Sequence, residues 1–320
     1  MTRSIFFLKL LLDAIRDTHK VCKYFELLKF NNILIYFKLF IIKFFYAFSF
    51  IRNKRKILKN IDNTGCEFFI DEKIDLNNLV KDVDKNGFSE IFTIRKDYIE
   101  GIKNYVLDKE NILIKENFPN KHLLMKNPNE KINDYFDRLK KEKISRLTAS
   151  IDIKKNSILR DFLFSKFMIE FSKSYLNSYD FSINATLFIS NPLKISEQEK
   201  YKNAQYFHWD NDFKKFFKFY IYLSDVDLNS GPHIFIPQTH KTKLKPFKLC
   251  RLYSDQNVYK QYNKPKIFTG KSGSSFLTDS YGLHKGETPI EKSRLILNIH
   301  YGVGKILYSN NDEYINLNRP

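Results

Sequence analysis

The hydrophobic pattern changes near residue 180. Before that point apolar residues recur at helical spacing, most clearly from Ile158 to Tyr175, and Ser157 is well suited to cap the start of this helix. After it, short apolar and aromatic runs alternate with turn signals such as Asn229-Ser230-Gly231 and Gly270-Lys271-Ser272-Gly273. Helices followed by many short strands predict a mainly β fold with flanking helices, in which a jelly roll occupies about residues 181–303.

Three segments have the strongest strand character: Ala185–Ser190, Phe216–Leu223 and Leu295–Ile299. Upstream, the pattern predicts a short helix from Leu76, a strand over Ser89–Ile94 and a second helix from about Asp97. Residues 110–155 are polar and rich in Lys and Asn, so we expect loops and short helices there, lying over the mouth of the β fold.

Residues 1–60 differ from the rest and predict a separate helical segment ahead of a domain over residues 61–320. Ile33–Ile51 is long enough to cross a membrane, but Lys38 and Lys43 would each cost several kcal/mol inside the span. Two interpretations therefore stay open for residues 33–56: peripheral contact with an anionic membrane surface, or packing against the following domain. No cleavable secretory signal is evident.

Composition narrows the class of protein. The 320 residues are 43% hydrophobic and carry a net charge of +18. Lysine, asparagine and isoleucine are abundant along the whole chain, so the positive charge reflects the general composition rather than a local basic binding motif. Zinc-finger spacing and RNP-like aromatic motifs are missing from the sequence, so we expect no nucleic-acid partner. Three widely spaced cysteines favour a reducing compartment. We expect a cytoplasmic protein, with association at the inner membrane face as the alternative.

The strongest chemical signal is the run His208-Trp209-Asp210. Residues two apart on an extended strand point to the same face, so this run presents an imidazole and a carboxylate side by side. His284 is the best third ligand from a distant strand. Two histidines and one carboxylate with open positions form the metal site used by non-haem Fe(II) oxygenases.

Several rival ligands are weaker candidates than these three. Asp212 lacks the spacing of two from His208, and Asp225 and Asp227 lie next to a glycine turn. The rival histidines are His233, His240 and His300. We expect a structural hydrogen bond from His240, and His300 to point toward the interior of the β fold near the site.

Arg294 lies ten positions after His284, across the polar turn Glu287–Lys292. A hairpin there would return the chain beside His284 and bring the guanidinium near the metal. Its planar fork suits a bidentate contact with a carboxylate, as the far end of a dicarboxylic co-substrate would require. Other candidates for hydrogen bonds to such a co-substrate are Ser190, Lys218, Tyr220 and Thr288, of which Ser190 is preferred.

The ordered set His208-x-Asp210, His284 and Arg294 resembles the phytanoyl-CoA dioxygenase family of Fe(II)/2-oxoglutarate oxygenases. The resemblance covers roughly residues 75–303. It includes Asn86-Gly87-Phe88, Gly231-Pro232-His233 and Pro237-Gln238-Thr239-His240-Lys241, where Gln238 replaces the usual glycine of that turn.

The resemblance implies a double-stranded β-helix of the cupin-like jelly-roll type. It implies that Fe(II) is held by His208, Asp210 and His284, and that 2-oxoglutarate is bound by Arg294 and Ser190. The implied reaction uses O2 to hydroxylate a small-molecule or lipid-linked substrate while 2-oxoglutarate is decarboxylated to succinate.

Two other functions compete with this one. The first is a non-catalytic binding or structural protein on the same fold, which would be expected to have lost one of the four residues. The second is a zinc hydrolase or isomerase, but no glutamate base in a setting like H-E-x-x-H accompanies the histidines. No residue in the sequence selects the substrate.

Overall fold

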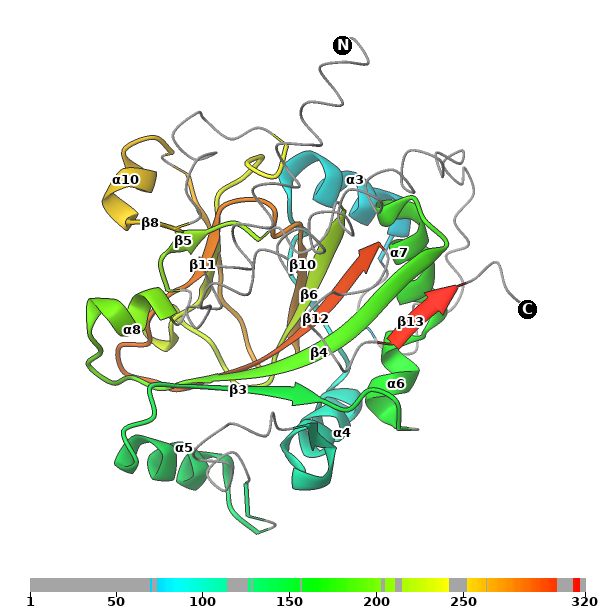
Figure 1. Cartoon of the computed structure of the whole chain (residues 1–320). Helices are drawn as coiled ribbons and strands as arrows, with labels where there is room; N and C mark the ends of the chain where they lie inside the picture. The colour runs from blue at the N-terminus through cyan, green and yellow to red at the C-terminus, as the bar shows by residue number, and fades with distance from the viewer. Residues whose placement is uncertain are drawn as a thin grey trace, which may run out of the picture. The chain divides into compact units, whose positions relative to one another are not determined.

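Two antiparallel sheets of unequal width form the centre of the computed structural model (Figure 1). The structure describes residue 70 and residues 74–113, 126–127, 129–155, 157–202, 205–210, 215–241, 252–262, 264–303 and 313–316. All of them belong to Leu58–Pro320, the second of two units into which the chain divides. The predictions for residues 1–60, membrane contact included, fall outside the described residues, and the boundary near residue 60 stays a prediction.

The larger sheet has eight strands in the order β1-β10-β6-β12-β4-β3-β2, with β13 also paired to β4. Their bounds are β1 Phe92–Thr93, β2 Ile112–Leu113, β3 Arg146–Ile151, β4 Asp180–Ser190, β6 Phe216–Tyr222, β10 Ser274–Thr278, β12 Arg294–Val303 and β13 Glu313–Asn316. The smaller sheet has five strands in the order β8-β5-β11-β7-β9. Their bounds are β5 Phe207–His208, β7 His233–Phe235, β8 Leu252–Tyr253, β9 Lys266–Phe268 and β11 His284–Gly286. This mainly antiparallel arrangement confirms the predicted jelly-roll class.

Helices precede most of the strands along the described chain. Their bounds are α3 Leu76–Asn86, α4 Lys96–Leu107, α5 Ile132–Lys141, α6 Ile158–Leu163, α7 Lys166–Leu176, α8 Glu197–Lys202 and α10 Asp255–Tyr259, with short 3-10 turns η3 Lys109–Asn111 and η5 Leu228–Ser230. The apolar faces of α3, α4, α5, α6 and α7 share one hydrophobic core with the larger sheet. Among the described residues, no helix is long and apolar enough to cross a membrane.

Alternation along β12 separates the core from the site. Leu295, Leu297 and Ile299 pack into the core shared with the helices. Arg294 and Asn298, like Ile296 between them, line a cavity on the other face of the sheet. Because successive strand residues point to opposite faces, one strand serves both purposes.

Two predicted elements differ from the structure. The single helix expected over Ile158–Tyr175 is two helices, because Ser165 accepts a hydrogen bond from the backbone N–H of Met168 and caps a second start. Ser157 caps the first, as predicted. The expected strand over Ser89–Ile94 is reduced to Phe92–Thr93, flanked by isolated bridges at Phe88 and Ile94.

The larger sheet also extends beyond the predicted range 181–303. Part of the segment expected to be loops, Arg146–Ile151, is strand β3 and pairs with β4 along six residues. Its side chains alternate between the buried core and the opposite face, which is the period-two pattern of a strand. Strand β13 lies beyond the predicted end and also pairs with β4.

Candidate metal centre

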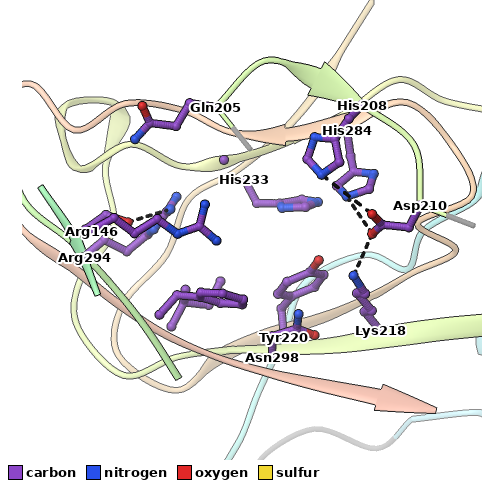
Figure 2. Close-up of a pocket in the computed structure, with 14 residues that line it drawn as sticks. Arg146, Gln205, His208, Asp210, Lys218, Tyr220, His233, His284, Arg294 and Asn298 are labelled. Carbon is purple, nitrogen blue, oxygen red and sulfur yellow. Dashed lines mark hydrogen bonds and ion pairs between the residues drawn. The ribbon is translucent and has the colours of Figure 1, made fainter. Parts of the chain in front are cut away.

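The structure brings His208, Asp210 and His284 together on the face of the smaller sheet that looks toward the larger one (Figure 2). The two histidines are directly opposite each other on the adjacent antiparallel strands β5 and β11. Directly paired residues project to the same side of a sheet, which places the imidazole centroids 4.3 Å apart. The sequence positions are distant, but strand pairing makes the two rings neighbours.

Asp210 follows β5, and a backbone hydrogen bond to the segment before β11 holds it beside the two histidines. Its N–H donates to the Ser280 carbonyl at 2.8 Å, close to the start of β11. Trp209 turns the other way and is buried in a separate apolar cluster. The carboxylate oxygens lie 3.9 Å from His208 Nε2 and 3.4 Å from His284 Nε2.

Hydrogen bonds orient both imidazoles. His208 Nδ1 is 2.9 Å from the Tyr206 carbonyl, and His284 Nδ1 is 3.0 Å from the Gly282 carbonyl. A carbonyl oxygen only accepts, so Nδ1 carries the proton in each ring and Nε2 is the atom that can coordinate a metal. The available ligand atoms of His208, Asp210 and His284 all lie within 4.8 Å of one another. This donor set fits a first-row divalent metal with open coordination positions.

Lys218 is the charged neighbour of this group. Its Nζ donates to Asp210 Oδ2 at 2.6 Å from the facing strand β6. Burial alone would raise the pKa of the Asp210 carboxyl, but the ammonium of Lys218 opposes this effect, and the pKa lies well below its ordinary value. Asp210 is therefore ionised at neutral pH, as a metal ligand must be.

Arg294 lies at the other end of the same cavity (Figure 2). It is paired with Ser190 across β12 and β4, and its Nη2 lies 3.4 Å from Ser190 Oγ. The side chain is buried, yet its Nε and Nη1 have no hydrogen-bond partner among the described residues. Burial lowers the pKa of this guanidinium from its ordinary value. A buried cation with two hydrogen-bond donors that have no partner among the described residues is suited to bind an anionic ligand.

The predicted hairpin between His284 and Arg294 is wrong. β11 belongs to the smaller sheet and β12 to the larger one, so the intervening segment crosses between sheets. Backbone N–H groups of Ile290 and Glu291 donate to the Asn229 carbonyl and hold this crossing beside η5. Arg294 still lies close to β11, because a Cβ added to Gly286 would come within 3.0 Å of its Nη2.

The cavity between the two ends measures about 180 Å³. A water molecule takes roughly 30 Å³ in the liquid, so this space accommodates a small organic acid. Residues that also line it include Tyr220, Phe188, Ile296 and His233. Burial raises the pKa of Tyr220 to about 12, and burial lowers the pKa of His233 well below its ordinary value, so both rings are neutral.

Three polar lining residues were not anticipated as ligand contacts. Arg146 on β3 is paired with Ser190, so two arginines flank this serine on adjacent strands. The sequence feature that could have identified Arg146 is the alternation of polar and apolar residues along β3. Asn298 is a polar residue between Leu297 and Ile299 on β12, and Gln205 accepts a hydrogen bond from Thr288.

Asp212 lies outside the described residues, and the other rival ligands that the structure describes have structural contacts. Asp227 caps η5, and Asp225 accepts hydrogen bonds from Lys271 and Ser272. His240 Nε2 hydrogen-bonds the Asp84 carbonyl, as expected of a structural histidine. His300 is buried with its ring against Phe216. Gln238, which replaces the usual glycine, has a φ of 64°, the left-handed conformation that glycine adopts most easily.

The sequence matches no protein-family model, and the search of curated proteins gives no match. Solved structures with a similar fold include the α-ketoglutarate-dependent carbocyclase SnoK from nogalamycin biosynthesis, with a TM-score of 0.46 and 11% identity over 79% of this chain and 99% of that one. HygX from Streptomyces hygroscopicus, with nickel, 2-oxoglutarate and hygromycin B bound, has a TM-score of 0.44 and 10% identity over 73% and 88%. EctD from S. alaskensis has a TM-score of 0.46 and 13% identity over 78% and 86%. At these values neither reaction nor substrate transfers to this chain.

Proposed function

We propose that this protein is an Fe(II)/2-oxoglutarate-dependent dioxygenase that hydroxylates a small molecule. The observation that carries the proposal is the pairing of two features in one cavity. A His-Asp-His group whose ligand atoms lie within 4.8 Å of one another is at one end. The buried Arg294, whose Nε and Nη1 have no hydrogen-bond partner among the described residues, is at the other. A metal alone would not require Arg294, and a carboxylate alone would not require the triad.

In this proposal the residues of the smaller sheet bind the metal, and those of the larger sheet bind the co-substrate. His208, Asp210 and His284 would hold Fe(II), with both imidazoles fixed by backbone carbonyls. Arg294 and Ser190 would bind the distal carboxylate of 2-oxoglutarate, where burial strengthens a charge-assisted hydrogen bond. Arg146, one strand beyond Ser190, would add a second guanidinium at that carboxylate.

The cavity walls would serve to position the co-substrate and exclude water. Tyr220 and Ile296 line the cavity together with the triad and the arginines, and the guanidinium carbon of Arg146 lies over the Phe188 ring, 4.7 Å from the ring centroid. When bound, Fe(II) supplies the redox chemistry that couples O2 and the decarboxylation of 2-oxoglutarate to substrate oxidation. Membership of the phytanoyl-CoA dioxygenase family is part of this proposal and is supported by the ordered sequence motifs.

Anaerobic titration tests the proposal directly. Adding 2-oxoglutarate to the Fe(II)-loaded protein should produce a visible charge-transfer absorption, and admitting O2 should then release succinate. The His208→Ala protein is the control for the metal and should show neither signal. Equal responses from both proteins, or no absorption from the unmodified chain, would leave a non-catalytic binding protein as the better description.

A further inference from the structure

The larger sheet has more strands than the smaller sheet that faces it, and part of its inner face is only half-buried among the described residues. On β12, the inner-face residues Arg294 and Asn298 are buried. On the neighbouring strands β4 and β3, the same face is half-buried at Asn184, Thr186 and Ser150. None of these three lines the cavity itself. Thr186 lies beside the lining residues Phe188 and Asn298, on the side of the sheet away from β6 and β10, because the strand order is β10-β6-β12-β4-β3.

Strand register aligns these side chains in one polar strip. Asn298 on β12 is paired with Thr186 on β4, and Thr186 is paired with Ser150 on β3. Asn184 lies two residues before Thr186 on the same face of β4. Paired residues on adjacent strands have side chains close enough to contact one ligand. We call Ser150, Asn184, Thr186 and Asn298 the polar strip.

Asn298 connects the strip to the cavity. Its side chain lines the cavity close to Tyr220, the residue of β6 with which Asn298 of β12 is paired (Figure 2). It is 7% exposed, and among the described residues its Oδ1 has no hydrogen-bond partner. A buried amide oxygen left open in this way calls for a donor from a bound molecule.

We propose that the polar strip is the substrate-binding surface and that the substrate is polyhydroxylated, a saccharide or polyol. This inference rests on the proposed function and specifies its substrate class. Serine and threonine hydroxyls and the asparagine amide all carry both donors and acceptors, and so do the hydroxyl groups of such a substrate. The strip has no formal charge, so hydrogen bonding decides what binds to it.

The same residues disfavour an acyl chain. Covering three or four hydroxyl and amide groups with methylenes would remove them from water without replacing their hydrogen bonds. The charged groups of the cavity, Arg146, Arg294 and Lys218, lie outside the strip on neighbouring positions of the sheet. A lipid-linked substrate is therefore the less favoured alternative.

Paramagnetic relaxation tests the inference with probe molecules in place of the natural substrate. The full chain is loaded with Mn(II) in place of Fe(II), 2-oxoglutarate is added, and proton relaxation of maltose, sorbitol and decanoate is measured. We expect enhanced relaxation of maltose or sorbitol and none of decanoate. Thr186→Val and Asn298→Leu should each reduce the enhancement about fivefold, the effect of one lost hydrogen bond.

Thr93→Val is the matched control, because Thr93 lies on β1 at the opposite edge of the same sheet. The Thr93→Val protein should enhance the proton relaxation of maltose and sorbitol as much as the unmodified chain does. Circular dichroism and Mn(II) binding of each variant separate a lost contact from a lost fold. Relaxation of decanoate alone, relaxation of no probe, or strip variants that behave like Thr93→Val would overturn the inference while leaving Mn(II) binding intact. Failure of the unmodified chain to bind Mn(II) would instead refute the proposed function, and this inference with it.

Discussion

Lys218 donates a 2.6 Å hydrogen bond to Asp210, so one oxygen of the predicted metal-binding carboxylate already has a cation of the protein's own. The pair spans the two halves of the site, since Lys218 is on β6 of the larger sheet and Asp210 follows β5 of the smaller one. Partners outside the ligand set orient metal-binding carboxylates and tune them. Lys218 is therefore a positioning residue for Asp210, a role that differs from the co-substrate contact expected from the sequence.

Replacing Lys218 should destabilise the metal-free protein. In Lys218→Met a buried carboxylate loses its partner, and breaking such a pair costs about 3–5 kcal/mol. Urea unfolding should show a loss in this range, and added Mn(II) should recover part of it because the ion replaces the missing charge. The matched control is Lys271→Met, which removes an exposed partner of Asp225 and should change the free energy of unfolding by at most about 1 kcal/mol.

The ionisation of Asp210 predicts acid sensitivity. Its pKa is lower in the folded than in the unfolded chain, so its contribution to stability is complete above the unfolded value of about 3.9. That contribution should disappear as the pH falls from there through the folded pKa. Urea unfolding of the metal-free chain at several pH values should show a steeper acid loss than Asp210→Asn. Parallel curves for the two proteins would contradict this ionisation behaviour.

Removal of the Arg294 guanidinium should weaken co-substrate binding and stabilise the empty protein. Truncating one partner of a buried charge pair costs about 2–5 kcal/mol, so Arg294→Met should raise the Kd for 2-oxoglutarate about 100-fold. Without ligand, the same change removes an unpaired buried charge and should increase the free energy of unfolding by about 1 kcal/mol or more. Calorimetric titration and urea unfolding measure the two effects.

Arg294→Lys keeps the charge but loses the planar fork, so its Kd should rise only about tenfold. Arg95→Met is the matched control, because Arg95 is on the surface and paired with Asp97. It should alter neither the Kd nor, by more than about 1 kcal/mol, the stability. An Arg294→Met protein that binds 2-oxoglutarate as tightly as the unmodified chain would remove Arg294 from the co-substrate site.

A methyl group at Gly286 should disturb Arg294 without touching the triad. The added Cβ would lie 3.0 Å from Arg294 Nη2, so the guanidinium must move by a few tenths of an ångström. We expect Gly286→Ala to raise the Kd for 2-oxoglutarate about tenfold, equivalent to about 1.4 kcal/mol, while Mn(II) affinity stays unchanged. Equal losses of metal and co-substrate affinity would indicate a general distortion of β11.

Local signals predicted the strands that carry the site. The bounds of β6, Phe216–Tyr222, differ by one residue from the prediction, whereas β12 extends the predicted Leu295–Ile299 to Arg294–Val303. His208 and Asp210 were recognisable because the two side chains are neighbours in sequence as well as in space. His284 and Arg294 were found through the order of motifs, and they face the same cavity although the hairpin proposed to join them does not exist.

The remaining features depend on contacts that periodicity does not encode. Arg146 lies in a segment dominated by lysine and asparagine, and its six-residue strand has only a brief alternating pattern. Lys218 alternates with aromatic residues along β6, but the sequence gives no sign that its ammonium reaches Asp210. Asn298 is an isolated polar residue whose environment is set by β4 and β6 on either side.

The proposed metal ligands belong to one sheet and the proposed carboxylate-binding residues to the other, so the packing of the two sheets sets the distance between the two parts of the site. The span between His284 and Arg294 is fixed by how the two sheets pack, so it does not depend on the length of the loops that connect them. Such loops can therefore diverge in evolution and adapt the entrance to new molecules, while the spacing between the metal ligands and Arg294 stays the same.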